Sequence, residues 1–579
     1  MTVSSSSLTR QGFSRTAWVA ASAIALGAAI FGAATLRRTG VTIDEPALLY
    51  AGDRTLYALW HPRQPGVLDF RAGDPPGFHS HFPRLPEPQD PEHYPVLPAL
   101  TASVADATIG RALGLGPVDG HHLGLGLLAV AALFLYTLYA CRLLGDLAGV
   151  AAGLALACFP TAVAHTLNDP KDWPCAMFYA LTVLAAGVGL RERRPRHLWL
   201  AGVYLGLALS CKQNGVLAAV TVLLAAPFLF RRSSRELRRE NPRENPDARR
   251  LIAPLLLLPY LGAAIFLLAW PWLWWAGPSQ AVARLGDFIG YARTASLSSR
   301  AGWSAHPFRC LVWLTPPVVL LAAAASTWPG RRPNREGLAV RILLWIWLLL
   351  PLVRIARPHA NFYDGNRHFI EYVPALCALA GLGVAELWRG ARPVVAAAFG
   401  AASTRGVAVA AIAAGALALI WPLVAYHPFE IAYFNVLAGG LGRAQRDGLF
   451  RSASTPLANG TEGDYWSSSL RDGMRAAAAA APPGRPIGVC AWLPALAAVD
   501  SDGDGPPPAV TTETGRADVA VVYVSPREKR CSWKKVHELE RQRTLRARVE
   551  RGGGLIYEIL GPRTATEHPA ISAPTVYDP

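Results

Sequence analysis

Long apolar runs separated by short polar stretches dominate the sequence, and this pattern restricts the fold more than any other feature. A helix needs about 20 predominantly apolar residues to cross the hydrocarbon core of a bilayer. The runs lie at about 17–36, 123–141, 147–164, 173–190, 198–211, 216–230, 251–275, 310–328, 338–353, 369–388 and 404–425. Backbone polar groups have no partner in lipid, so spanning segments are helical. The sequence therefore predicts an all-α polytopic membrane domain with about eleven transmembrane helices.

The composition agrees with this class. Only 17% of the 579 residues are charged, whereas a soluble domain carries about 25%. The net charge of +16 comes from Lys and Arg in short clusters between apolar runs, where they indicate membrane topology. No nucleic-acid-binding motif is present, and we expect no nucleic-acid partner.

The first apolar run, 17–36, allows two interpretations. Arg10 and Arg15 precede it, and residues 32–34 (GAA) resemble a signal-peptide cleavage context. The run is long for the apolar core of a signal peptide and has the length of a span. We therefore favour an uncleaved first transmembrane helix.

The basic loops predict the orientation of the helices. The loops richest in Lys and Arg are 191–196, 231–250, 331–341 and 389–405. All four are cytoplasmic if the N-terminus is cytoplasmic, as the positive-inside rule expects; Arg37 and Arg38 are the exceptions. We expect a multi-pass protein of the plasma (inner) membrane with an extracytoplasmic, periplasmic C-terminus. The outer segments are then about 37–122, 165–172, 212–215, 276–309, 354–368 and everything after about 426.

Two domains are expected. Residues 1–429 form the membrane domain, whose outer loop 37–122 carries surface helices. Within that loop, 94–115 contains Asp106 and Arg111 and is typical of a helix lying on the membrane surface. Residues 430–579 have a different composition and predict a small extracytoplasmic α/β domain. Its expected strands are 487–492, 519–524 and 555–560, with a helix at 532–548.

The cysteines do not predict a metal site. The eight cysteines form no CxxC pair, and most lie in apolar runs, where they behave as small hydrophobic residues. Cys490 and Cys531 lie in the tail, and a disulfide between them is expected if the tail is in an oxidising compartment. No cofactor is predicted. The His-rich outer loop leaves a divalent metal open, although no ligand spacing supports one.

Polar residues collect beside the outer ends of the spans. Charged residues at membrane depth cost roughly 2.5–3.5 kcal/mol on insertion scales, so they usually face a cavity where they act. These segments predict one outward-facing site. Its candidate residues are Asp44, Glu45, His165, Asn168, Asp169, Lys171, Asp172, Lys212, Arg357, Tyr363, Arg367 and His368.

Several of these residues also have a structural interpretation. Asp169 fits a helix N-cap, with Pro170 at the first helical position and Asp172 two residues later. The same helix start, next to Lys171, is equally suited to binding an anion. Arg357 also fits a contact with lipid headgroups, and Asp44 with Glu45 fits an ordinary solvated pair.

Four stretches resemble a known family. They are the acidic pair 44–45 after the first span, 165–174 (HTLNDPKDWP), 363–374 (YDGNRHFIEYVP) and 426–440 (YHPFEIAYFNVLAGG), with 464–466 (DYW) following the last. In this order they resemble the glycosyltransferase C-fold enzymes. The resemblance is to bacterial members of the protein O-mannosyltransferase and aminoarabinose transferase group, which are similar to dolichyl-phosphate-mannose-protein mannosyltransferases.

The resemblance implies a function and residue roles. The family implies an inverting transfer of a sugar, hexosyl and mannosyl-like, from a polyprenyl-phosphate carrier in the membrane. The acceptor outside the membrane is a protein Ser/Thr, a lipid or an envelope glycan. Asp44 matches the general base and Glu45 its neighbour. We expect Lys171, Arg367, His368 and Arg357 to hold the carrier phosphate, because a leaving phosphate needs cations or a helix N-terminus.

Two other functions are compatible with the membrane class. A transporter or flippase of lipid-linked sugar predicts polar residues at mid-span and paired broken helices. A membrane-anchored sensor predicts that the tail binds a ligand and that Asp44 is dispensable. The polar residues gathered at one face favour the transferase.

The topology has a direct test. Reporter fusions at Arg243, in the loop 231–250, and at Gly515, in the tail, should report opposite sides of the membrane because of the distribution of basic residues. The same sidedness at both positions would contradict the whole scheme.

Overall fold

The computed structural model describes most of the chain. The described residues are 12–82, 94–230, 246–295, 297–327, 335–362, 364–449, 463–466, 468–482, 485–489, 510–511, 517–523 and 533–563. Tyr363, Cys490 and Cys531 lie outside them, so the expected roles of these residues stay predictions.

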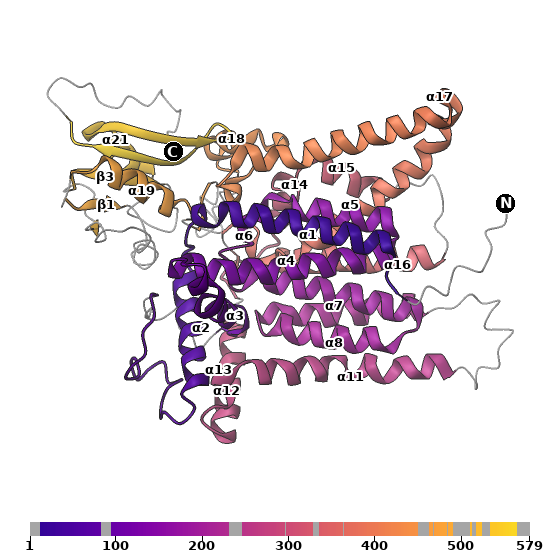
Figure 1. Cartoon of the computed structure of the whole chain (residues 1–579), viewed down its shortest axis with the longest axis horizontal. Coiled ribbons are helices and arrows are strands. Elements are labelled where there is room, and N and C mark those ends of the chain that lie inside the picture. Colours follow the sequence, from indigo (N-terminus) through magenta and orange to yellow (C-terminus); the bar gives the residue numbers. More distant parts are fainter. Residues whose placement is uncertain are drawn as a thin grey trace.

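Long helices lie side by side in one bundle (Figure 1). They are α1 (Arg15–Thr35), α4 (Pro117–Leu144), α5 (Asp146–Ala157), α7 (Asp172–Glu192), α8 (Pro195–Leu209), α9 (Val216–Phe230), α11 (Pro246–Ala269), α14 (His306–Trp313), α15 (Pro317–Ala325), α16 (Arg335–Ala356) and α17 (Tyr372–Tyr426). Gly400, with φ of 78°, breaks α17 into two spans. The predicted polytopic all-α membrane domain is confirmed.

The number of spans depends on helix length. Among the described residues, eight helices are long and apolar enough to cross a membrane, or nine if α14 and α15, bent by 106°, form one broken span. The expectation was about eleven. The difference lies in α5 and α8, which pack within the bundle but have 12 and 15 residues, fewer than the about 20 that a full span requires.

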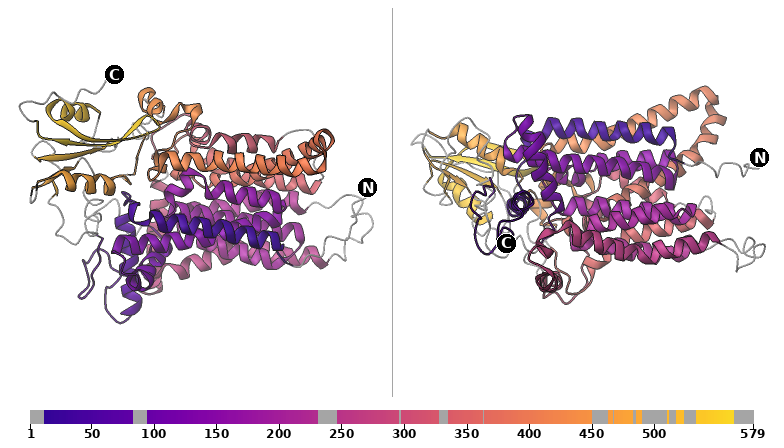
Figure 2. Two further views of the ribbon diagram at one scale, coloured as in Figure 1. Left: turned by 45° about the horizontal axis from the view of Figure 1, so that its top comes forward. Right: turned by 60° about the horizontal axis from the view of Figure 1, so that its bottom comes forward.

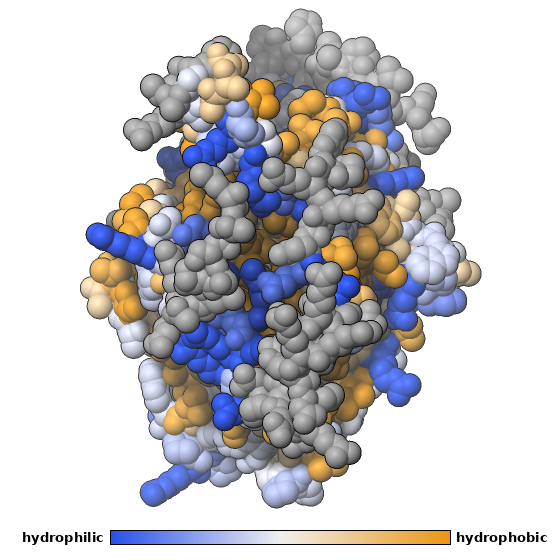
Figure 3. All heavy atoms as spheres, turned by 90° about the vertical axis from the view of Figure 1, so that its right-hand side faces the viewer, coloured by the Kyte–Doolittle hydropathy of each residue, from blue (hydrophilic) through white to orange (hydrophobic). Residues whose placement is uncertain are grey.

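The two ends of the bundle differ in character. The turn between α7 and α8, the start of α16 and the break in α17 lie at the end where α1 begins, and the sheet of the C-terminal region lies at the other end (Figures 1 and 2). Seen end-on, the first end exposes many hydrophilic residues (Figure 3). Where the structure describes them, the predicted basic loops 191–196, 331–341 and 389–405 thus lie at one end, as expected, and the described parts of the predicted outer segments lie at the other. Most of the loop 231–250 lies outside the described residues.

Short helices cover the end of the bundle near the sheet. They are α2 (Glu45–Trp60), α3 (Leu97–Ala105), η4 (Asp106–Gly110), α6 (Pro160–His165), α12 (Pro271–Trp274) and α13 (Pro278–Ala295). The expected surface helix at 94–115 corresponds to α3 and η4. The acidic pair Asp44 and Glu45 stands at the start of α2, which begins at Glu45. Pro46 is tolerated there because the first turn needs no hydrogen bond from its nitrogen.

The C-terminal region contains the expected sheet. Strands β1 (Ile487–Val489), β2 (Val510–Thr511), β3 (Val519–Tyr523), β4 (Thr544–Arg551) and β5 (Gly554–Gly561) are ordered β2-β1-β3-β5-β4. Helices α18 (Gly440–Asp447), α19 (Leu470–Ala480) and α21 (Trp533–Gln542) accompany them. The small α/β region is confirmed, while its boundary at 429/430 stays a prediction.

One element of this region was predicted wrongly. The expected helix 532–548 ends at Gln542, and the rest of the segment is strand β4, antiparallel to β5. Leu545, Ala547 and Val549 alternate with Arg residues, which is the period of a strand. Gly552 and Gly553, both with positive φ, allow the tight turn that joins the two strands.

Close helix packing has one clear test. A Cβ on Gly383 of α17 would overlap the carbonyl oxygen of Ala322 in α15, whereas a Cβ on Gly390 would meet no atom. Gly383→Ala should therefore push the helices apart and lower the thermal midpoint of the purified protein. Gly390→Ala is the matched control and should leave it unchanged or raise it, because Ala favours helix by about 1 kcal/mol. Equal midpoints for both variants would contradict this packing.

Candidate active site

Asp44 is the meeting point of three segments distant in sequence. It precedes α2, and its Oδ2 accepts a hydrogen bond from Nζ of Lys171 at 2.8 Å and from a guanidinium nitrogen of Arg367 at 2.6 Å. The Asp44 side chain is 13% exposed, while those of Lys171 and Arg367 are 5% and 2% exposed. The predicted meeting of Lys171 and Arg367 across two spans therefore occurs, with the carboxylate of Asp44 between them.

A second set of charges surrounds this pair of cations. Asp172, the first residue of α7, forms an ion pair with Lys212 and lies 3.4 Å from Arg367. Asp364 forms an ion pair with Arg367 at 2.7 Å. Three cations and three carboxylates thus form one nearly buried cluster, called here the ionic cluster: Asp44, Asp172, Asp364, Lys171, Lys212 and Arg367. Buried charges persist only when paired in this way.

The start of α7 explains how Lys171 is held. The carboxylate of Asp169 accepts hydrogen bonds from the backbone nitrogens of Lys171 at 3.1 Å, Asp172 at 2.8 Å and Trp173 at 2.9 Å. It also contacts Nδ1 of His165 at 2.8 Å. Asp169 is buried and fully engaged in capping the helix. Asp169 therefore caps the helix start as expected, but the expected positions are wrong, because α7 begins at Asp172 and Pro170 precedes the helix.

The carboxylate of Glu45 has different partners from that of Asp44. The Glu45 carboxylate accepts the backbone N–H of Thr42 at 2.9 Å and contacts Nε2 of His122 in α4 at 2.7 Å. The side chain has no exposed surface. Glu45 thus fixes the loop before α2 and does not reach the ionic cluster.

Aromatic rings border the cluster. Nζ of Lys171 lies 4.6 Å from the centre of the Tyr94 ring, and the guanidinium of Arg367 lies 4.9 Å from that of Trp466. Both distances are within the range of cation–π attraction. His165 lies beside Trp466 and contacts the hydroxyl of Tyr465 at 3.2 Å. A segment of the C-terminal region therefore forms part of the site.

The remaining predicted residues lie outside the cluster. Arg357 is exposed at the end of α16, which agrees with a contact with lipid headgroups. Asn168 is buried and donates to the carbonyl of Gly40 at 3.0 Å. His368 follows Arg367, and burial, together with Arg367, Lys212 and Lys171, holds the pKa of its imidazole well below the usual range. This shift favours the neutral imidazole, and the expected contact of His368 with the carrier phosphate stays a prediction.

Lys171 keeps its charge despite its burial. Burial alone would lower the pKa of its ammonium group, but the carboxylates of Asp44 and Asp172 outweigh this effect and the pKa is raised. Within the described part of the chain, no group of three or more His, Cys, Asp or Glu side chains is arranged to hold a metal ion. A divalent metal thus stays an open expectation.

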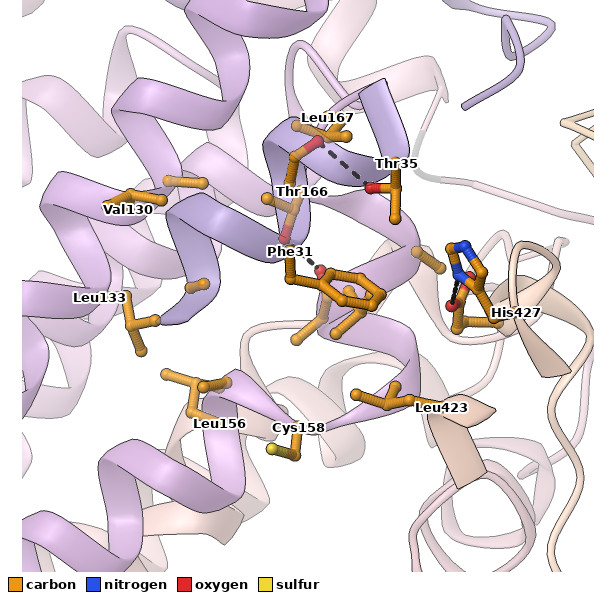
Figure 4. Close-up of a pocket in the computed structure, with 18 of the residues that line it drawn as sticks. Phe31, Thr35, Val130, Leu133, Leu156, Cys158, Thr166, Leu167, Leu423 and His427 are labelled. Carbon is orange, nitrogen blue, oxygen red and sulfur yellow. Dashed lines mark hydrogen bonds and ion pairs between the residues drawn. The ribbon is translucent and has the colours of Figure 1, made fainter. Parts of the chain in front are cut away.

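A large apolar pocket lies at the same end of the bundle (Figure 4). Its volume is about 780 Å³, and α1, α4, α5 and the end of α17 line it with residues such as Phe31, Leu133, Leu156 and Leu423. Trp173 and Asn168, which flank the cap of α7, also line it. The segment that starts α7 therefore borders the pocket and also carries Lys171.

Some site residues were missed from the sequence. Tyr94 and His122 belong to the outer loop and to α4, and no motif distinguishes them from other aromatic residues. Asp364 lies in the stretch 363–374 that resembles the family, but it is not among the site residues predicted from the sequence. Trp466 belongs to the short stretch 464–466, whose resemblance to the family was the one signal that could have identified it.

Breaking the cluster should destabilise the protein. Lys212→Met leaves Asp172 buried with fewer cations, which typically costs about 3–5 kcal/mol, so the thermal midpoint should fall. Adding Asp172→Asn removes the stranded charge and should restore part of the loss. Arg357→Met, at an exposed position, is the control and should change the midpoint little. No recovery in the double variant would contradict the pairing.

Comparison with known proteins agrees with the resemblance noted above. Residues 124–242 match the family model described as dolichyl-phosphate-mannose-protein mannosyltransferase, which confirms that resemblance over this part of the chain. No curated protein sequence matches.

Two solved structures illustrate the similarity. ArnT from Cupriavidus metallidurans bound to undecaprenyl phosphate is 16% identical, with a TM-score of 0.45 over 95% of this chain and 99% of that chain. The archaeal oligosaccharyltransferase AglB from Archaeoglobus fulgidus, in complex with an inhibitory peptide and a dolichol-phosphate, is 12% identical, with a TM-score of 0.41 over 69% of this chain and 55% of that chain. Over residues 124–242, the chain is similar to the dolichyl-phosphate-mannose-protein mannosyltransferase family.

Proposed function

We propose that the protein is an inverting glycosyltransferase that moves a sugar from a polyprenyl-phosphate carrier to an acceptor at the outer face of the plasma (inner) membrane. The observation that carries the proposal is the single carboxylate of Asp44 held between Lys171 and Arg367. Such a site offers a proton acceptor and two cations within reach of one another. The match of residues 124–242 to a mannosyltransferase family supports the same reaction.

Three residues of the ionic cluster have a direct role in this reaction. Asp44 takes the proton of the acceptor hydroxyl, whose oxygen bonds to the anomeric carbon of the sugar. The bond between that carbon and the phosphate oxygen breaks, and the electron pair leaves with the polyprenyl phosphate. Lys171 and Arg367 stabilise the charge on the leaving phosphate, as fixed cations do for a developing anion.

The charge balance of the cluster suits an incoming phosphate. Without donor, Asp44 is the anion that pairs with Lys171 and Arg367. A carrier phosphate brings its own negative charge to these two cations and so competes with Asp44 for them. Donor binding would thereby release the carboxylate to accept a proton.

The apolar pocket supports a lipid-linked substrate. Its walls are hydrocarbon side chains of membrane helices, and the polar residues Thr39, His427 and Glu430 line it where α1 and α17 end. A polyprenyl chain enters such a pocket from the bilayer, which is equally apolar, so the pocket holds the chain by close packing and not by removing it from water. We propose that a lipid chain lies in this pocket while the polar end of the same lipid reaches the outer surface.

The sugar and the acceptor are proposed more finely from the family match. We propose a hexosyl, mannose-like donor, with a protein Ser/Thr, a lipid or an envelope glycan as acceptor. Purified protein should release polyprenyl phosphate from polyprenyl-phosphate mannose when an acceptor is present. Release only from a polyprenyl-phosphate aminopentose would replace the hexosyl assignment, and no release from any polyprenyl donor would reject the function.

Asp44→Asn tests the catalytic base. The change keeps the size of the side chain but removes the proton acceptor, so turnover should fall at least about 10²-fold. The donor KM should not rise, because both cations remain and the carboxylate that competes with the carrier phosphate for them is gone. Asp447→Asn, which alters an exposed ion pair with Arg443, is the control and should retain full turnover. Normal turnover by Asp44→Asn would remove Asp44 from this role.

Lys171→Met tests the phosphate contact. A charge-assisted hydrogen bond contributes about 1.5–3 kcal/mol, so loss of Lys171 should weaken donor use by roughly ten- to a hundred-fold. Steady-state kinetics with varied donor concentration measure the effect. Arg443→Met, which removes a cation from an exposed ion pair with Asp447, serves as the control. An unchanged kcat/KM for the donor in folded protein would exclude the contact.

A further inference from the structure

The loop that carries Asp44 is held from one side by the C-terminal region. The backbone N–H of Ile43 donates to the carbonyl of Trp466 at 3.0 Å. Gly40 lies so close to Ser468 that a Cβ at Gly40 would overlap its carbonyl oxygen. Segment 464–475 thus packs against segment 39–43, more than 400 residues earlier in the chain.

Arg471, in the first turn of α19, ties three parts of the molecule together. One guanidinium nitrogen donates to the carbonyl of Thr39 at 2.8 Å, and another pairs with Asp119 in the first turn of α4 at 2.8 Å. The Arg471 side chain is 1% exposed and that of Asp119 is 5% exposed. A buried guanidinium is stable only when its partners are present, so Arg471 requires the loop, α4 and α19 to be docked together.

The opposite side of the loop is fixed by α4 as well. Glu45 accepts the backbone N–H of Thr42 and contacts His122, three residues after Asp119 in α4. Arg475, one turn after Arg471 in α19, donates to the carbonyl of Arg37 at 2.6 Å. The backbone from Arg37 to Glu45 is therefore held between α4 and α19, with Asp44 projecting toward Lys171 and Arg367.

From these contacts we propose that Arg471 is a positioning residue, and that segment 464–475 is a clamp that sets the Asp44 carboxylate against its two cations. The C-terminal region would then be a working part of the active site. This inference rests on the proposed function of Asp44. Catalytic geometry tolerates little error, since a displacement of about 1 Å can cost about 10²-fold in rate.

The clamp predicts a separation between turnover and donor binding. Lys171 is placed by the start of α7 and Arg367 by η7 (Arg367–Phe369). Only the guanidinium of Arg367 also contacts the clamp, through the ring of Trp466. Loss of Arg471 should therefore displace the base and leave the phosphate contacts in place. A role in folding alone would lower the amount of active protein without changing the kinetic constants of the molecules that fold.

The variants are Arg471→Met, Arg471→Lys and the control Arg443→Met, all in the full-length protein in lipid nanodiscs. The kcat per folded molecule should be on the order of 10²-fold lower in Arg471→Met than in the wild type. Arg471→Lys keeps the charge but cannot reproduce both guanidinium contacts, to the Thr39 carbonyl and to Asp119, so its kcat should be intermediate. The donor KM should stay within about twofold for both, and Arg443→Met should match the wild type.

Hydrogen exchange gives a readout that does not depend on activity. Amides of segment 39–44 should exchange faster in Arg471→Met than in Arg443→Met, while those of β5 should be unchanged. Unchanged exchange in this segment of Arg471→Met, or a normal kcat per folded molecule, would contradict the proposal that segment 464–475 positions Asp44. If exchange is faster in Arg471→Met but the wild-type protein transfers no sugar, the proposed clamp is retained and the proposed function is rejected.

Discussion

The rest of the site depends on one shared interaction, the pairing of the Asp44 carboxylate with both Lys171 and Arg367. This contact joins the beginning of the first outer loop to the start of α7 and to η7. Buried charges cost several kcal/mol each unless they are matched, so the loops that carry them have one favourable arrangement. Asp172 must likewise be paired with Lys212, and Asp364, in the segment before α17, with Arg367. The ionic cluster is therefore both the candidate chemistry and a constraint on how the spans meet.

Capping and chemistry are divided among neighbouring acidic residues. Asp169 and Asp172 are three positions apart, yet Asp169 satisfies the first amides of α7 while Asp172 pairs with cations. Asp44 and Glu45 divide in the same way, because Glu45 holds Thr42 and His122 and leaves Asp44 to face the cluster. In both pairs one carboxylate fixes the backbone and the other is placed by it. A catalytic group on a loop gains its precision from such support.

The C-terminal region contributes side-chain and backbone contacts to the candidate active site. Trp466 covers the guanidinium of Arg367, and its carbonyl accepts the N–H of Ile43. The side chain of Asp464 orders the turn before α19 by accepting the backbone N–H groups of Trp466, Ser468 and Ser469. The region thus reaches the ionic cluster through a short ordered segment, while its sheet lies at the end of the bundle (Figure 2).

The sequence by itself determined the membrane class, the approximate positions of the spans and the end of the bundle where polar residues collect. These follow from hydropathy and charge, which act locally along the chain. It also suggested Asp44, Lys171 and Arg367, through motifs in the predicted outer loops. Only the tertiary structure decided that Asp169 is a cap, that Glu45 faces His122 and that burial lowers the pKa of His368. Those outcomes depend on which buried partners meet across the bundle, and contacts such as Arg471 with Asp119 join residues 352 positions apart, which no local pattern encodes.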